Sequence, residues 1–322
     1  MSRLRVISDP EEAERLWMDL YALQPDPSPF YEWDFSESIA ELFGWKCLTV
    51  QVEEVLLAKL VVRKRSFFSD VVVPPLTQFT PILLAPSADN EARQAALKCL
   101  FEDHAALPFS RYFSFAPHLS SILEGVGSNW CHMAKDTYVL PTANTEEAIA
   151  KWSSSTRRNF RNATDKYEFT SEAVSSKHVV EMTETAYERA GMKLSLPSHV
   201  VGTFAEALVE RGLGRIVGLT SKETGELEAG IVLIESKEMA WYWLAGSERG
   251  EAMTVLMAHT QEFLHQRGIA ALDLVGANTP SIAEFKRRFG GALVSYTHVV
   301  RQSRSLKMAK SLNALFTGEM SP

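Results

Sequence analysis

The sequence predicts an α/β protein of the α+β kind, with two domains that each hold a mixed, mostly antiparallel sheet flanked by helices. Its 322 residues are enough for about two domains with sizeable cores. Apolar runs with strand character alternate with segments of helical spacing along the chain. Both halves also repeat one order of elements: helices, a meander of strands, a helix and final strands. We expect the domains to cover residues 1–141 and 142–322.

The first half begins with a helix over 9–23, because Asp-Pro-Glu-Glu places a proline and two acids in the first turn. Two more helices are expected at 36–43 and 92–104. The stretch 71–75 is apolar but ends in two prolines, which suits an edge or the end of a strand. The other expected strands are 46–51, 54–62, 81–85, 112–115 and 131–140.

The second half opens with helical segments and continues as a meander. Helices are expected at 145–152, 153–166, 179–190 and 198–211. A strand at 169–174 is followed by the meander 214–220, 227–235 and 239–245. Apolar residues alternate with lysines over 305–316, which predicts an amphipathic helix docked on the first domain.

The stretch 239–268 carries the strongest local signal for function. An aromatic strand, Ala240–Ala245, leads into the polar loop Gly246–Gly250 and then into a helix with one apolar face. Backbone N–H groups and the positive end of the helix dipole then face the loop, which suits a phosphate or pyrophosphate. The alternative is that the two glycines only let the chain turn. Downstream, the pattern predicts a strand at 270–275, a helix at 281–289 and a strand at 292–300.

This strand–loop–helix–strand–helix–strand order resembles the acyl-CoA-binding half of a GNAT (Gcn5-related N-acetyltransferase) domain. The phosphate loop of that family reads [Arg/Gln]-x-x-Gly-x-[Gly/Ala]. The matching positions here are Ser247, Gly250 and Ala252, so the first position departs from the family. The resemblance implies that Gly246, Ser247, Gly250 and Ala252 bind the donor.

Three further segments resemble the Fem-type (FemAB-like) acyltransferase and aminoacyltransferase family, which is built from two GNAT-like domains in tandem. They are Ser153–Ala163 with its Arg-Arg-Asn, Glu284–Gly291 with its Phe-Lys-x-x-Phe-Gly, and Pro74–Leu83. The chain lacks the long helical-hairpin insertion of some tRNA-using members. The resemblance therefore implies an acyl-CoA co-substrate, with aminoacyl-tRNA as the alternative, and no permanently bound cofactor.

The resemblance places a Phe-Lys pair, Phe285 and Lys286, at the active site. Lys286 would bring positive charge to the reacting carbonyl or to a phosphate of the acceptor, with Phe285 packed beside it. The alternative is that Lys286 belongs to a solvated cationic helix face. Asp273 points away from its apolar neighbours on strand alternation and could take the amine proton through water, or it could be a capping carboxylate. Tyr296 is a candidate general acid for a thiolate, or a core tyrosine.

Two other groups are candidates for substrate binding. Arg157 and Arg161 share one helix face and Arg158 lies beside them, which suits a phosphate on the acceptor or a tRNA end. The alternative is a solvated helix whose arginines pair with acids. Tyr242 and Trp243 lie on the strand that would open around the donor, and alternation requires one of them to face the core.

Composition excludes several classes of function. The net charge is −7 and the pI about 5.7, which disfavours DNA as a partner. No apolar run is long enough for a membrane span, and the first residues lack the apolar segment of a signal peptide, so we expect a cytoplasmic protein. The three cysteines are expected to be small buried residues. The eight histidines lack ligand spacing, so no metal site is predicted.

The leading prediction is an N-acyltransferase that moves an acyl group from acyl-CoA to an amine of a small-molecule or cell-envelope precursor. One alternative is an aminoacyl-tRNA-dependent transferase acting on a peptidoglycan precursor, which would need a basic surface for tRNA. Another is a non-catalytic scaffold whose donor loop has decayed at Ser247. Peripheral membrane contact through the basic stretch 301–316 is a further alternative to docking.

Overall fold

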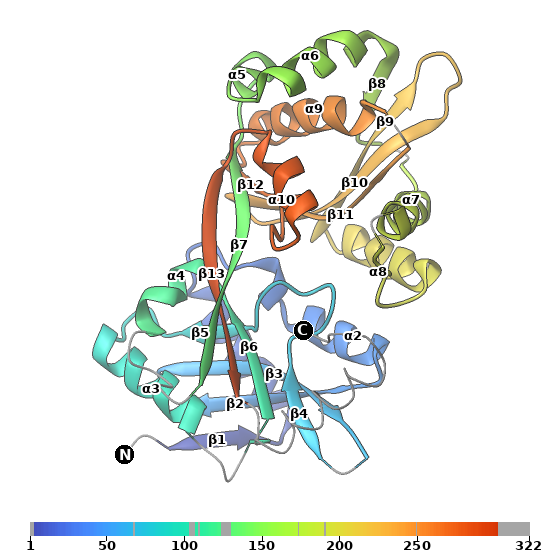
Figure 1. Cartoon of the computed structure of the whole chain (residues 1–322). Coiled ribbons are helices and arrows are strands. Elements are labelled where there is room, and N and C mark those ends of the chain that lie inside the picture. Colours follow the sequence, from blue (N-terminus) through green and yellow to red (C-terminus); the bar gives the residue numbers. More distant parts are fainter. Residues whose placement is uncertain are drawn as a thin grey trace. The chain divides into compact units, whose positions relative to one another are not determined.

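The computed structural model describes residues 3–66, 68–102, 107–108, 110–123, 130–172, 174–189, 191–248 and 250–301 (Figure 1). The chain divides into two compact units. Unit 1 holds the described residues up to Ala134 and from Tyr296 onward, and unit 2 is Lys135–Ser295. The chain passes between the units within two long strands, β7 (Cys131–Pro141) and β13 (Ala292–Arg301). The sequence placed one boundary at residue 141 because a loop follows there, whereas the division falls inside both strands.

Unit 1 is a mostly antiparallel sheet with the strand order β1-β2-β3-β4-β6-β13, and β5 pairs with β3. Among the strand pairs of its described residues, β4 and β6 are the parallel one. The helices are α1 (Pro10–Ala22), α2 (Trp33–Leu42), α3 (Asn90–Glu102) and α4 (Pro117–Ser120). The strands are β1 (Leu4–Ile7), β2 (Lys46–Val52), β3 (Leu56–Lys64), β4 (Ser69–Val72), β5 (Ile82–Leu84) and β6 (Ser110–Phe115).

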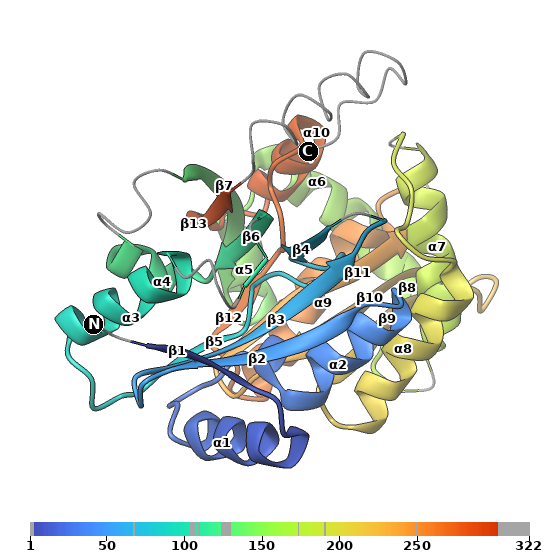
Figure 2. The same cartoon turned by 90° about the horizontal axis from the view of Figure 1, so that it is seen from below.

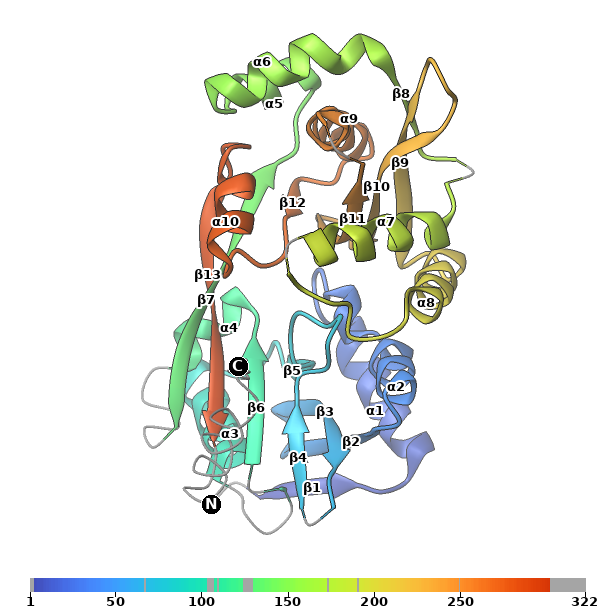
Figure 3. The same cartoon turned by 45° about the vertical axis from the view of Figure 1, so that its right-hand side comes forward.

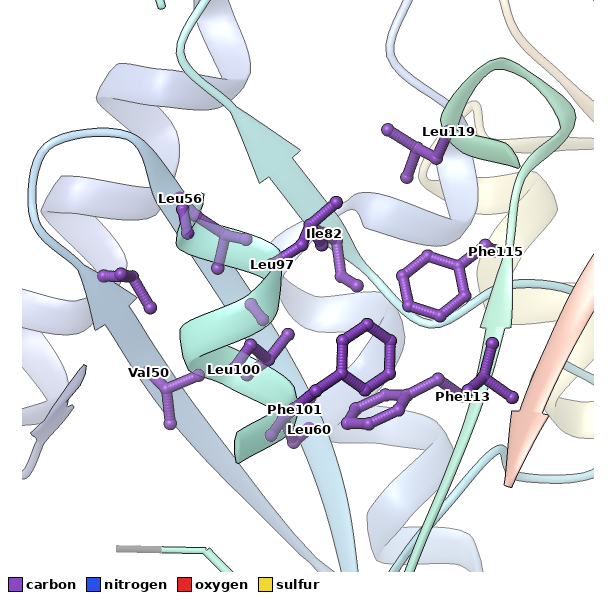
Figure 4. Close-up of a cluster of buried hydrophobic side chains, with 14 of the residues drawn as sticks. Val50, Leu56, Leu60, Ile82, Leu97, Leu100, Phe101, Phe113, Phe115 and Leu119 are labelled. Carbon is purple, nitrogen blue, oxygen red and sulfur yellow. The ribbon is translucent and has the colours of Figure 1, made fainter. Parts of the chain in front are cut away.

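The two faces of this sheet are different. One face packs against α3, where Leu97, Leu100 and Phe101 meet Phe113 and Phe115 of β6 in an apolar cluster (Figure 4). The other face lies toward α2, which contacts β2 and β3 (Figure 2). Because strand residues alternate, Leu56, Ala58 and Leu60 of β3 join the α3 cluster, whereas Lys59 faces α2 together with the apolar Leu57 and Val61.

Unit 2 has the strand order β7-β12-β11-β10-β9-β8; over the residues that the structure describes there, β11 and β12 are the one parallel pair. Its helices are α5 (Thr145–Ala150), α6 (Ser154–Ala163), α7 (Ser176–Arg189), α8 (Ser198–Glu210), α9 (Ala252–Gln266) and α10 (Pro280–Arg287). Its remaining strands are β8 (Tyr167–Thr170), β9 (Gly214–Ser221), β10 (Leu227–Glu235), β11 (Met239–Ser247) and β12 (Ala271–Asp273).

A row of three glycines crosses this sheet and seats α7. Gly230 of β10 is paired with Gly218 of β9 on one side and with Gly246 of β11 on the other. A Cβ on Gly246 would lie 2.3 Å from the backbone of Met182, and one on Gly230 would lie 2.4 Å from Val179. The missing side chains let α7 lie directly on the strands (Figure 3). The neighbouring apolar residues of the same strands pack against α9 on the opposite face.

Most of the expected elements are present, with shifted ends. The meander β9–β11, the helix α9 and the helix α10 are confirmed. Of the two alternatives for the stretch 71–75, the strand end is confirmed, because β4 ends at Val72 and the prolines follow it; β4 itself lies between β3 and β6 and not at an edge. Cys131 is exposed, contrary to the expected burial, because it begins a strand whose first residues face solvent. The predicted tail helix at 305–316 lies outside the described residues. Of the helices that are described, none is long and apolar enough to cross a membrane.

Candidate active site

The site in unit 2 is built where β11 and β12 separate. The two strands are paired only from Met239↔Ala271 to Trp241↔Asp273. β12 then ends, while β11 continues to Ser247. Within the described residues, no strand pairs with this side of β11 beyond Trp241. The backbone N–H and C=O groups of Tyr242–Ser247 on that side therefore form a short sheet edge that an extended ligand can pair with.

A β-bulge lies at the point of separation. Val232 of β10 pairs with Leu244, whereas the next residue, Leu233, pairs with Tyr242. Trp243 is therefore the extra residue on β11, and a bulge of this kind bends a strand and re-aims its side chains. The bulge explains why β11 leaves the direction of β12.

The N-terminus of α9 lies just after this edge. Gly250 connects the two with φ of 129°, and a Cβ there would meet no atom within 4 Å. The N-cap residue Glu251 makes no side-chain hydrogen bond to the helix. The first-turn N–H groups of α9 have no partners inside the helix, so they can bind an anion beside the open glycine.

The four predicted donor-binding residues have different roles in the structure. Gly250 fits the prediction by its backbone conformation and open surroundings. Ala252 is buried as the first residue of α9. Gly246 lies instead against α7, where its missing side chain permits close packing. The carbonyl of Ser247 accepts a hydrogen bond at 2.7 Å from Nη2 of Arg189, the last residue of α7. The structure thus brings a guanidinium to the loop at the position where the sequence has serine.

Lys286 is buried, not part of a solvated cationic face. Its ammonium donates three hydrogen bonds to successive carbonyl oxygens, those of Leu274 and Val275 at 2.6 Å and Gly276 at 2.8 Å. These use all three of its N–H groups. Burial lowers the pKa of Lys286 to about 8, while the negative charge of Asp273 opposes that shift. The next two cations, Arg287 and Arg288, pair with the exposed Glu284 instead.

Asp273 holds the same loop from the end of β12. Its Oδ1 accepts a hydrogen bond from the Thr137 hydroxyl at 2.5 Å and another from the Val275 N–H at 2.7 Å. Val275 has a left-handed φ of 51°, uncommon for a β-branched residue, and Gly276 follows with 75°. Asp273 and Lys286 together fix this strained turn, so both act on the shape of the loop that leads into α10.

Tyr242 and Trp243 point to different neighbours because of the bulge. The Tyr242 hydroxyl donates to Sδ of Met253 at 3.4 Å, in the first turn of α9, and its ring centroid is 5.7 Å from Lys286 Nζ. Burial, and then the nearby Tyr187, raise the pKa of Tyr242 above its ordinary value. Trp243 packs against Phe204 of α8. Only Tyr242 therefore lies beside Lys286 and α9.

The remaining predicted residues lie elsewhere. Phe285 packs edge-to-face on Phe289, which anchors α10 in the core of unit 2. Tyr296 belongs to unit 1, where its ring contacts Phe79 and His298. His298 is in turn hydrogen-bonded to the hydroxyl of Tyr112. Tyr296 is therefore grouped with aromatic residues of unit 1, while Lys286, Asp273 and Tyr242 are grouped in unit 2.

Arg157, Arg158 and Arg161 lie on α6, which Ser153 caps by accepting the N–H of Thr156. Arg157 donates to the carbonyl of Ala150 at 2.9 Å, and the other two side chains are exposed. In the described part of the chain, none of the three forms an ion pair, so the pairing with acids that the sequence allowed does not occur there. The same part contains no group of three or more His, Cys, Asp or Glu side chains that could hold a metal ion.

Three residues of this site were not singled out from the sequence. Thr137, Tyr187 and Arg189 reach it from β7 and α7, far from the loop along the chain. Nothing in their local sequence distinguishes them. Only the position of Arg189 in the last turn of a predicted helix, where a cation is favourable, could have drawn attention.

Comparisons with known proteins bear on the fold that carries this site. Residues 150–287 match a family model described as an acetyltransferase (GNAT) domain. The chain superposes on a crystal structure of FemX with a TM-score of 0.69 at 12% identity, over 95% of this chain and 99% of that one. A conserved protein of unknown function from Bacteroides thetaiotaomicron gives 0.60 at 9% identity, over 93% and 100%.

A third structure, L-PGS from Bacillus licheniformis, gives a TM-score of 0.53 at 11% identity, over 97% of this chain and 98% of that one. No curated protein matches the sequence significantly. At these identities the structures show a shared fold, and the predicted Fem-like architecture is confirmed.

Proposed function

We propose that this protein is an N-acyltransferase, since residues 150–287 match a GNAT acetyltransferase domain model and the chain has the fold of FemX. It transfers an acyl group from an acyl-CoA thioester to an amine of a small molecule or a cell-envelope precursor. The proposal is carried by one observation: the open edge of β11 leads directly to the uncapped N-terminus of α9.

The donor would lie with its amide-containing arm along β11 and its pyrophosphate at the N-terminus of α9. Its amide-containing arm extends along the part of β11 that follows Trp241 and hydrogen-bonds to the backbone there, as an added strand does. Its pyrophosphate lies at the first turn of α9, beside Gly250, where N–H groups and the helix dipole favour negative charge. Arg189 supplies the cation that Ser247 does not.

Transfer then needs positioned reactants and stabilised charge. The amine nitrogen attacks the thioester carbonyl, the C–S bond breaks, the amine loses a proton to water, and the thiolate takes up a proton. Tyr242 already directs its hydroxyl at a sulfur atom, Sδ of Met253. Its raised pKa keeps the phenol protonated, so we assign it the hydrogen bond to the leaving thiolate. Lys286 and Asp273 act as positioning residues through the loop 274–276.

The experiment is calorimetric titration of the full chain with acetyl-CoA and CoA. Gly250→Val should abolish binding, because its side chain fills the open space of the phosphate site. Gly212→Val is the matched control: Gly212 also has positive φ and open surroundings, but it follows α8. The proposal fails if neither CoA compound binds the native chain, or if both variants bind equally well.

One observation favours a second candidate, an aminoacyl-tRNA donor. The exposed Arg158 and Arg161 of α6 have no acid partner in the described chain and could contact RNA phosphates. Binding of charged tRNA would then weaken steeply with salt, and the double variant Arg158→Gln/Arg161→Gln would reduce that salt dependence by about two phosphate contacts. Salt-independent or absent tRNA binding would leave acyl-CoA as the donor.

A further inference from the structure

Unit 1 contains a fully buried lysine in the part of the chain that the acetyltransferase match does not cover. Lys59 lies on β3, and none of its side chain is exposed. Its Nζ donates to the carbonyl of Trp33 at 2.6 Å and lies 3.2 Å from the centroid of the Trp33 ring. A buried ammonium is costly unless it is paired and hydrogen-bonded, so its surroundings must supply negative charge.

The present counter-ion of Lys59 comes from the solvent side. Glu37 of α2 approaches Nζ with one carboxylate oxygen, at 3.1 Å, and its side chain is 48% exposed. Burial lowers the pKa of Lys59, and Glu37 opposes that shift. The two halves of the pair therefore differ: the lysine is fixed inside the unit, whereas the carboxylate can turn out into water at little cost.

A small cavity of about 10 Å³ lies beside Lys59, with room for one oxygen-sized group. Lys59 and the hydroxyl-bearing residues Ser36, Thr77 and Thr80 line it, and valine and proline side chains form its walls. Oγ1 of Thr77 is buried and has no hydrogen-bond partner in the described structure. Oγ1 of Thr80 accepts the N–H of Ser114 at 3.0 Å, which leaves its own hydrogen able to donate.

We propose that unit 1 binds a small carboxylate through this cavity, with one ligand oxygen seated between Lys59 and the threonine hydroxyls in place of Glu37. The ion pair is exchanged, not lost, because the ligand carboxylate takes over the neutralisation of Lys59 while Glu37 becomes solvated. The unpartnered Thr77 hydroxyl gains an acceptor. The cavity admits one oxygen only, so the rest of the ligand lies outside it, on the solvent side where Glu37 now stands.

The same lining disfavours a phosphate. Phosphate recognition usually uses several cations or a fork of N–H donors, whereas this cavity offers a single ammonium. The carboxylate could belong to a free acid or to the C-terminus of a peptide. Both share the recognised group, so the experiment uses one probe of each kind.

The experiment is saturation-transfer NMR of the full chain, with titration to obtain Kd, using propionate for the free acid and glycylglycine for the peptide. Phosphate is the competing anion. Short carboxylates should bind in the millimolar range. Tighter binding of glycylglycine points to a peptide ligand, and tighter binding of propionate to a free acid; either supports the carboxylate site.

Four variants decide the role of the named residues. Lys59→Met should abolish binding, and Glu37→Gln should tighten it about ten-fold by removing the internal competitor. Thr77→Val should weaken it several-fold, since one hydrogen bond to a charged group is lost. The matched control is Thr260→Val, which removes a buried, unpartnered hydroxyl from α9 of unit 2 and should leave Kd unchanged.

The proposal is overturned if neither probe binds at up to about 50 mM, in which case the cavity holds a water molecule only. It is also overturned if phosphate binds better than both probes, or if Lys59→Met binds as the native chain does. Should Lys59→Met fail to fold, equal Kd values for Thr77→Val and Thr260→Val would reject the site. The readout is binding without any acyl donor, so the result is independent of the acyltransferase proposal.

Discussion

Asp273 and Lys286 bind the same residue from opposite sides: the carboxylate of Asp273 accepts the N–H of Val275 at 2.7 Å, and the ammonium of Lys286 donates to its C=O at 2.6 Å. The peptide groups before and after Val275 are thereby both held. Val275 stays in a left-handed conformation that a β-branched residue rarely adopts. The strain of the turn is offset by two charged groups and is maintained only while both are present.

Replacing Lys286 by Met should destabilise unit 2 by about 3 kcal/mol, because three buried carbonyl oxygens lose their donor at once. Urea unfolding followed by circular dichroism measures the change. The control is Arg287→Met on the exposed side of the same helix, where the loss of a surface pair should cost less than about 1 kcal/mol. Equal losses of stability in the two variants would contradict the role of Lys286 in holding the loop 274–276.

The stability of the native chain relative to Lys286→Met should rise with pH between about 8 and 10.5. The folded pKa of Lys286 is lowered to about 8 from 10.5, so in this window the unfolded chain binds more protons than the folded chain. The relative gain is on the order of 3 kcal/mol across the window. The free energy of unfolding of the variant is subtracted from that of the native chain at each pH. The subtraction removes the pH dependence that the buried tyrosines contribute to both proteins. A difference that is flat from pH 7 to 10 would show that the lysine titrates at its ordinary pKa.

Tyr242→Phe should lower kcat about 10- to 100-fold with little change in KM, because the phenol acts on the leaving thiolate and not on binding. Release of the free thiol, CoA or aryl thiol, measures the rate. An aryl thioester, whose thiolate needs less stabilisation, should lose less activity in the variant. The control is Trp243→Phe on the adjacent residue, which faces α8. A uniform loss with both thioesters would reject the assigned role.

Arg189→Gln should weaken acetyl-CoA binding about three- to ten-fold and make it less sensitive to salt. Glutamine can still donate to the Ser247 carbonyl, so the variant removes charge while it keeps the hydrogen bond. Glu248 and Glu251 flank the same loop, which is why a cation there matters for an anionic donor. Unchanged affinity would mean that Arg189 only fastens the end of α7 to β11.

Gly246→Ala should destabilise unit 2 by at least about 2 kcal/mol, because the new Cβ would lie 2.3 Å from the backbone of α7. Gly202→Ala in α8 is the control: its Cβ would lie 3.1 Å from the nearest atom, and alanine favours the helix. Thermal unfolding measures both. A stable Gly246→Ala protein that had lost donor affinity would instead restore the phosphate-binding role expected from the sequence.

Periodicity was sufficient to predict most elements of the fold. Local patterns predict β9–β11, α9 and α10, because each buries one face or both faces of a regular segment. The role of Gly246 could not be predicted, since it depends on α7, more than 50 residues away in the sequence. A glycine before a helix suits a phosphate loop and close packing equally well.

The sequence was sufficient to predict the role of a site residue that acts through its own backbone. It was not sufficient where the role of a residue depends on contacts with a distant element. Gly250 belongs to the first kind. Lys286 belongs to the second kind. It begins a run of cations that is typical of a solvated helix face. The turn at Val275, on another segment, supplies the carbonyl oxygens that bind its buried ammonium. Tyr296 looks adjacent to α10 in sequence, but it lies on the part of β13 that belongs to unit 1.

The passage of the chain between the units has a consequence for synthesis. Unit 2 is one continuous segment, Lys135–Ser295, whereas the sheet of unit 1 is completed only by Thr297–Arg301, which pairs with Phe115–Arg111 of β6. A ribosome therefore releases all of unit 2 before the last strand of unit 1. Unit 2 can therefore fold first. On the nascent chain β6 keeps an open edge until residue 301 has emerged. During that interval a chaperone can bind the edge, and premature termination would leave it exposed.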